Sequence, residues 1–144
     1  MAYTFQVTVD SAAPHALADW WADALGWEVE PSDEEFIRSM IAAGHAGEED
    51  TTTHRGALVW KAGQAIRHPE GLERAPRVLF QRIEEAKTVK NRVHLDVRTG
   101  DDDPRAVVDR LLAKGAVHLH DGSQGPYTWS TLADPEGNEL CISH

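Results

Sequence analysis

The sequence contains one strand pattern twice, as Phe5-Gln6-Val7-Thr8-Val9-Asp10 and as Val93-His94-Leu95-Asp96-Val97-Arg98. In both stretches apolar and polar residues alternate, which is typical of a β-strand with one buried face. A helical pattern follows each stretch, with matching apolar residues from Leu17 onward and from Pro104 onward. The strands are displaced by 88 positions (Gln6 to His94) and the helices by 87 (Leu17 to Pro104). These two offsets agree closely and indicate a duplicated βα module.

Each module continues with three further strand patterns, at 27–30, 57–60 and 77–83 in the first and at 117–120, 127–132 and 139–143 in the second. The last two strands are joined by Asp134-Pro135-Glu136-Gly137-Asn138, a turn sequence in which Pro and Gly supply the required backbone angles. Pro14 and Gly26 bound the first helix, and Asp103 and Gly115 bound the second. The sequence predicts an α+β fold with the order βαβββ, present twice.

The first module is longer than the second because it carries an insertion at residues 31–54. Ser32-Asp33-Glu34-Glu35 has the pattern of a capping box and predicts a short helix, followed by a polar loop over 48–53. We expect a single domain over 1–144, with module 1 at about 1–84, a linker at 85–91 and module 2 at about 92–144. The sequence leaves open whether the insertion is a lid over a pocket or a surface excursion.

Composition excludes several classes of function. The net charge of −10 argues against a general nucleic-acid binder, which needs cationic patches to displace counterions from phosphates. No apolar run approaches the length of a membrane span. Cys141 is the only cysteine, so an intrachain disulfide is excluded and a reducing compartment is expected. Because no export signal precedes the first strand, we expect the protein in the cytoplasm.

The chain resembles the vicinal oxygen chelate superfamily, which includes glyoxalase I, extradiol dioxygenases and the bleomycin- and fosfomycin-resistance proteins. The marks are the doubled βαβββ order, the helix ending Ala24-Leu25-Gly26-Trp27, and the closing stretch 133–139. Residues 87–96 and the ending Asn138-Glu139-Leu140-Cys141 are similar to small glyoxalase-like domain proteins of actinobacteria. The resemblance implies two modules that form a cupped, barrel-like mixed sheet with helices outside and a ligand cavity between the modules. It also implies a homodimer.

The resemblance further implies where a metal would bind. Metal-dependent members take ligands from the first and last strand of each module, commonly two His (or His and Gln) plus Glu residues. Carried over to this chain, the first strands offer Gln6 and His94, and the last strand of module 2 offers Cys141 where relatives have Glu. The matching position in module 1 is assigned to Gln81. Amides are weak donors, so we expect no tightly bound metal; the alternative is a divalent ion held by His94 with Glu139 or Cys141.

Strand alternation places Thr8 and Asp96 on the same faces as Gln6 and His94. Trp60 and Trp129 fall on the predicted third strand of each module, where they either form indole walls for a flat ligand or fill the barrel. Cys141 is either part of the site or a small buried filler. The predicted ligand-binding residues are Gln6, Thr8, Trp60, Gln81, His94, Asp96, Trp129 and Cys141.

His94 is the single candidate for a general acid or base. His118 and His120 alternate on one face of an expected edge strand. We therefore expect a protein that binds a small organic molecule in the cavity between its modules, without a tightly bound metal. The alternative is a metal-dependent lyase, isomerase or dioxygenase-type enzyme that uses His94 with Glu139 or Cys141.

Overall fold

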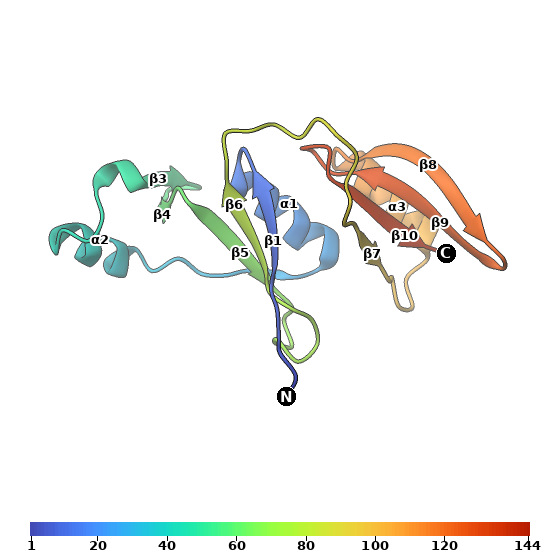
Figure 1. Ribbon diagram of the computed structural model, residues 1–144, viewed down its shortest axis with the longest axis horizontal. Helices are drawn as coiled ribbons and strands as arrows, with labels where there is room; N and C mark the ends of the chain where they lie inside the picture. The colour runs from blue at the N-terminus through green and yellow to red at the C-terminus, as the bar shows by residue number, and fades with distance from the viewer. The chain divides into compact units, whose positions relative to one another are not determined.

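A computed structural model describes residues 1–144 and shows a mixed α+β fold of three α-helices, one 3-10 helix and ten strands. The chain divides into two compact units, which we call unit 1 (Met1–Ala86) and unit 2 (Lys87–His144). Each unit has its own four-stranded sheet (Figure 1). None of the helices has the length and apolar character needed to cross a membrane.

The sheet of unit 1 has the order β1 (Val7–Ser11), β6 (Val78–Arg82), β5 (Gly63–Arg67), β2 (Glu28–Val29). β1 and β6 run parallel, and the other two pairs are antiparallel. α1 (Pro14–Leu25) packs against this sheet, because Leu17 and Trp21 bury their side chains with Phe80 and Ile66. The helix ends at Gly26, whose φ of 67° is the left-handed conformation that glycine adopts without strain.

Unit 2 repeats this arrangement with the order β7 (Leu95–Val97), β10 (Glu139–Ser143), β9 (Tyr127–Ala133), β8 (Val117–Gln124). β7 and β10 are parallel and the other pairs antiparallel, as in unit 1. α3 (Pro104–Ala113) covers one face, where Leu111 packs in a core with Leu132, Leu140 and Ile142. Asp103 caps this helix by accepting a hydrogen bond from the Arg105 N–H at 3.1 Å. The predicted duplication and fold class are confirmed.

The insertion in unit 1 is longer than predicted. It comprises α2 (Glu34–Ala42), the 3-10 turn η1 (Glu48–Asp50), β3 (Thr51–His54) and β4 (Ala57–Trp60). The expected loop over 48–53 is therefore wrong, because its second half forms a strand. The N-cap of α2 is Asp33, which accepts from the Phe36 N–H at 2.9 Å, whereas the capping box had placed Ser32 there.

The strand predicted at 57–60 exists, but it does not belong to the main sheet. It pairs with β3 as a separate two-stranded hairpin, and β5 takes the third position in the sheet. The hairpin turn consists of Arg55 and Gly56, with φ of 50° and 81°, which matches the left-handed backbone of a two-residue turn. The insertion therefore extends to Trp60 and not to residue 54.

Four contacts attach this hairpin to α1. The Nε2 atom of His54 lies 2.7 Å from an Asp19 carboxylate oxygen, and the Arg55 guanidinium lies 3.1 Å from the same oxygen. The His54 ring also stacks on His15, whose Nε2 lies 2.7 Å from the backbone oxygen of Trp60. The far end of the insertion is thus tied to the body of unit 1.

Candidate functional site

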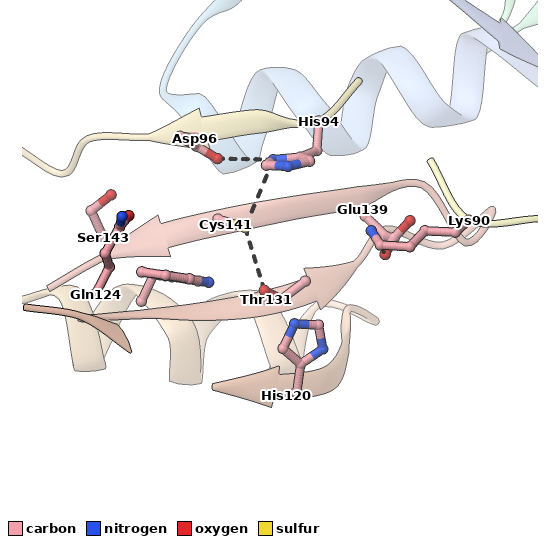
Figure 2. A pocket seen from close by; sticks show the side chains of 10 residues that line it. Lys90, His94, Asp96, His120, Gln124, Thr131, Glu139, Cys141 and Ser143 are labelled. Carbon is pink, nitrogen blue, oxygen red and sulfur yellow. Dashed lines mark hydrogen bonds and ion pairs between the residues drawn. The ribbon is translucent and has the colours of Figure 1, made fainter. Parts of the chain in front are cut away.

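Unit 2 contains a cavity of about 400 Å³ on the sheet face opposite α3 (Figure 2). The cavity is lined mainly by polar side chains from the linker and all four strands: Lys90, His94, Asp96, His120, Gln124, Trp129, Thr131, Glu139, Cys141 and Ser143. A volume of this size lies within the range of about 300–1,000 Å³ that is usual for small-molecule sites.

Strand register explains why these side chains meet. Asp96 lies directly opposite Cys141, which in turn lies opposite Thr131, and Thr131 lies opposite His120. Residues that are direct partners across neighbouring strands point to the same face of a sheet. The four side chains therefore form one row across the sheet, and His94 joins it because it is two residues before Asp96.

His94 is the centre of a close group. Its Nδ1 atom lies 2.9 Å from an Asp96 carboxylate oxygen and 3.9 Å from the Cys141 sulfur (Figure 2). One ligand atom from each of these three residues lies within 4.8 Å of the other two. An imidazole, a carboxylate and a thiol in this arrangement are able to transfer a proton or to hold a metal ion.

The Cys141 thiol is buried, with 6% of the residue exposed. Burial raises its pKa, and the hydrogen bond with the Thr131 hydroxyl at 3.4 Å opposes this only in part. Cys141 is therefore a neutral thiol at neutral pH in the metal-free protein. It is buried, as expected for a filler, and it also lines the cavity.

Glu139, the alternative metal ligand, already has two partners. Its carboxylate accepts hydrogen bonds from Lys90 Nζ at 2.8 Å and from the Asn91 backbone N–H at 2.6 Å. The bond from Lys90, followed by that from Asn91, lowers the pKa of Glu139, so this buried side chain stays ionised. Both carboxylate oxygens are used, and Glu139 serves to fix the linker against the sheet.

Trp129 forms an aromatic wall of the cavity. It lies directly opposite Gly122 on β8, and a Cβ atom at Gly122 would overlap the indole ring. The indole therefore occupies space that only glycine leaves free. This pair shows how the cavity obtains a flat wall at its edge strand.

The two histidines of β8 lie on opposite faces, and the expectation that they share a face is wrong. A bulge between His118 and His120 makes them the partners of the consecutive residues Leu132 and Thr131. His120 lines the cavity. His118 lies on the other face, with its Nε2 atom 2.9 Å from an Asp121 oxygen. The edge position of β8 is as predicted.

Three of the predicted site residues lie on the first and last strands of unit 1 or beside them. Gln6 accepts a hydrogen bond from Arg77 at 3.0 Å, and its amide nitrogen lies 3.4 Å from the Thr8 hydroxyl. Gln81 is exposed on β6 opposite Asp10. Each of these side chains is polar, but none is a strong metal ligand.

The two registers correct the match between the modules. In unit 2 the direct pairs are Leu95 with Leu140 and Asp96 with Cys141, and in unit 1 they are Val7 with Val78 and Thr8 with Leu79. The equivalent of Cys141 is therefore Leu79, and the assignment of Gln81 to that position is wrong. Unit 1 offers Gln6, Thr8 and Leu79 where unit 2 offers His94, Asp96 and Cys141. The ligand set that the resemblance implies does not fit unit 1, because an apolar side chain stands at its last-strand position.

Trp60 lies elsewhere than predicted. It is on the hairpin strand β4 and lines a separate cavity of about 200 Å³ within unit 1. Phe36 of α2, His15 of α1 and the ion pair of Glu30 with Arg77 line the same space. Trp60 and Trp129 therefore do not occupy equivalent strands of the two sheets.

Apart from Glu139, which was predicted only as an alternative metal ligand, five residues that line the unit 2 cavity were absent from the predicted ligand-binding set: Lys90, His120, Gln124, Thr131 and Ser143. The sequence indicated the position of two of them. Thr131 is two residues from Trp129 and Ser143 is two residues from Cys141, and residues two apart in a strand share a face. His120 had no such signal, since the bulge that turns it inward leaves no mark in the sequence.

Comparison with known proteins places the fold. The glyoxalase-like domain family matches residues 6–143. A glyoxalase/bleomycin resistance protein/dioxygenase family enzyme from Burkholderia phytofirmans PsJN superposes with a TM-score of 0.60 at 14% identity, over 96% of this chain and 94% of that chain. A member of the same superfamily from Sphaerobacter thermophilus DSM 20745 gives a TM-score of 0.59 at 13% identity, over 99% and 97% of the two chains.

A protein named trigger factor from Xanthobacter autotrophicus (strain ATCC BAA-1158 / Py2) is 34% identical over 123 residues, which covers 82% of this chain and 27% of that protein. The chain thus spans about a quarter of the length of this curated relative. The two solved structures share the fold, and the family match covers nearly the whole sequence. The chain belongs to the glyoxalase-like domain family.

Proposed function

We propose that this protein binds a small, flat organic molecule in the cavity of unit 2. The observation that carries the proposal is the pairing of Trp129 with Gly122, which leaves an indole wall on a cavity of about 400 Å³. Aromatic walls favour flat ligands, because the two ring faces stack with little loss of conformational entropy.

The polar floor supports a ligand that carries oxygen or nitrogen groups. His94, Thr131 and Gln124 present hydrogen-bonding side chains to the cavity. Lys90 and Glu139 add an ion pair at the end near the linker. A bound molecule with hydrogen-bonding groups on one edge and a ring on the other would use both kinds of wall.

A fluorescence screen tests this proposal. A panel of aromatic carboxylates and phenols is titrated into the full chain, and quenching of tryptophan emission is followed. The proposal expects at least one compound whose quenching is saturable in the wild type and weak in Trp129→Phe. Trp60→Phe is the matched control and should leave the quenching unchanged. If no compound quenches, or if Trp129→Phe behaves as the wild type, the proposal is wrong.

The second candidate function is an enzyme of the same superfamily, and the contact between His94 and Asp96 favours it. A carboxylate that accepts a hydrogen bond from one imidazole nitrogen orients the ring and leaves the other nitrogen free to take a proton. His94 would then be the general base of a lyase or isomerase. Mass spectrometry of each quenching compound after incubation separates the two functions. An enzyme forms product that His94→Gln fails to form, although this variant still binds.

The remaining expectations from the sequence also stay proposals: the cup between the modules, the homodimer, the cytoplasmic location and the actinobacterial subgroup. Light scattering of the purified chain during size-exclusion chromatography tests the homodimer. A mass of about twice 15.9 kDa supports it, and the mass of one chain contradicts it.

A further inference from the structure

We propose that the cavity of about 200 Å³ in unit 1 is a second ligand site, and that it binds a small organic ammonium ion. The site goes beyond the proposed function, because it lies within unit 1 and shares no residue with the cavity of unit 2. Drug-sized ligands occupy cavities of about 300–1,000 Å³, so this smaller space suits an amine with a short carbon chain.

The insertion supplies the aromatic walls of this cavity. Phe36 comes from α2 and Trp60 comes from β4, and both line the cavity. Each follows or precedes a buried anchor, because Ile37 is 1% exposed and Val59 is 5% exposed where α2 contacts β4. Unit 2 has no such insertion between its second and third strands, β8 and β9. The aromatic walls therefore belong to unit 1 alone.

Two polar side chains of the lining leave hydrogen-bond acceptors free. The amide nitrogen of Gln64 donates to two backbone oxygens, at 2.9 and 3.1 Å, which leaves its Oε1 atom without a partner. The Nε2 atom of His15 donates to the Trp60 backbone oxygen at 2.7 Å, so Nδ1 of the neutral ring is a free acceptor. Both atoms are accessible, since Asn91 Oδ1 is the only enclosed side-chain atom that lacks a partner.

Arg77, the one Arg or Lys of the lining, is already paired. It donates to both carboxylate oxygens of Glu30, at 2.7 and 2.9 Å, and to the Gln6 oxygen at 3.0 Å. An anionic ligand would have to displace this bidentate pair, which is among the stronger kinds of ion pair. Asp33, by contrast, accepts only the Phe36 N–H, at 2.9 Å and through one oxygen. Its second oxygen is free for a donor, so the lining favours a ligand that donates.

The charge of unit 1 also favours a cation. Unit 1 contains 15 Asp and Glu residues against 7 Lys and Arg residues, so 8 of the 10 net negative charges of the chain lie there. A negative field raises the local concentration of cations and repels anions. An ammonium group donates N–H to the free acceptors, pairs with a carboxylate and is attracted to aromatic faces. It thus matches each kind of group in the lining.

Titration with three compounds of similar size tests the proposal. Butylammonium has the charge and the N–H donors, butanol lacks the charge, and butanoate reverses it. Each is added to the ¹⁵N-labelled full chain, with sodium chloride as the blank for ionic strength, and ¹H–¹⁵N NMR spectra are recorded. Trp60→Phe and Trp129→Phe assign the two indole N–H signals. The proposal expects butylammonium to give saturable shifts of the Trp60 indole and of residues 30–36, and the other two compounds to give none.

Several results of this titration would overturn the proposal. One is the absence of a saturable shift with butylammonium. Another is equal binding of butanol or butanoate, which would show that apolar contact or Arg77 governs the site. A third is a shift of the Trp129 indole without one of the Trp60 indole, which would place the ion in the unit 2 cavity.

Variants identify the contacts. Asp33→Asn removes one charge and keeps the N-cap of α2, because asparagine caps a helix as well as aspartate does. It should weaken butylammonium binding by about fivefold, and Trp60→Leu should do so by a similar factor. Glu35→Gln is the matched control: it removes a charge from the same helical turn outside the cavity, and the affinity should stay within about twofold of the wild type.

Equal losses in Asp33→Asn and Glu35→Gln would contradict the site, because they would show that the general field of unit 1 attracts the ion. If Trp60→Leu fails to fold, Asp33→Asn and Glu35→Gln decide by themselves, since both residues are exposed.

Discussion

Leu79 and Cys141 occupy equivalent positions in the two sheets, each on the last strand and directly opposite a residue of the first. Their partners are Thr8 and Asp96, and Gln6 and His94 precede those partners by two residues. The strand pairing of the two sheets thus matches, while the side chains at these three pairs of positions differ in chemistry.

The contact of Gly122 with Trp129 predicts the effect of one methyl group. Gly122→Ala places a Cβ in the volume of the indole, so the ring must move or the strands must separate. We expect a loss of about 1–3 kcal/mol in the free energy of unfolding and a shifted tryptophan emission. Chemical unfolding followed by fluorescence measures both. Ser123→Ala, on the next position of β8, should change neither; equal effects in the two variants would argue against the contact.

The ion pair of Glu30 with Arg77 predicts a dependence of stability on pH. Two hydrogen bonds from Arg77, at 2.7 and 2.9 Å, lower the pKa of the Glu30 carboxyl below its ordinary value. Such a group stabilises the fold above the unfolded pKa of about 4.3, and the contribution is lost as pH falls through the folded pKa. Glu30→Gln should therefore cost about 1 kcal/mol at pH 7 and much less at pH 3.

Urea unfolding of Glu30→Gln at pH 7, 5 and 3 checks this. The exposed Glu35 is the matched control, and Glu35→Gln should follow the wild type at each pH. A constant difference between Glu30→Gln and the wild type over the whole range would show that packing, and not charge, explains the loss.

Asp19 holds both His54 and Arg55 of the hairpin that ends the insertion. Asp19→Ala should destabilise the hairpin by about 1 kcal/mol, because a hydrogen bond with His54 and an ion pair with Arg55 are lost. The measurement is hydrogen exchange by mass spectrometry, with faster exchange expected over residues 51–60. Arg55→Ala removes only the more exposed contact and should show a smaller change. Unaltered exchange in Asp19→Ala would mean that the hairpin is held by other contacts.

The alternation of apolar and polar residues, together with the residues that bound each helix, predicted most of the fold. The strands around Val7, Leu95 and Leu140, and the helix beginning at Pro104, lie where the pattern placed them. β5 was missed because Gly63-Gln64-Ala65-Ile66-Arg67 carries few residues that favour strands. The hairpin formed by β3 and β4 was missed because Arg55-Gly56 is not a strong turn signal for a left-handed backbone.

The candidate site was predictable only as far as the faces of the strands. Alternation correctly assigns a residue to one side of a sheet, but it does not distinguish positions that differ by two. Gln81 and Leu79 share a face, and only the pairing of β6 with β1 shows which one stands where Cys141 stands. The register of parallel strands is fixed by packing between distant segments, which a single sequence does not reveal.

The extra residue in β8 gives two imidazoles independent surroundings. His118 hydrogen-bonds to Asp121, which also accepts from the Ser130 hydroxyl, and His120 borders the hollow on the reverse side. Either histidine can therefore be substituted without changing the immediate surroundings of the other. Deleting Leu119 would remove the bulge and make the two histidines consecutive, so their rings would still point to opposite faces of the strand.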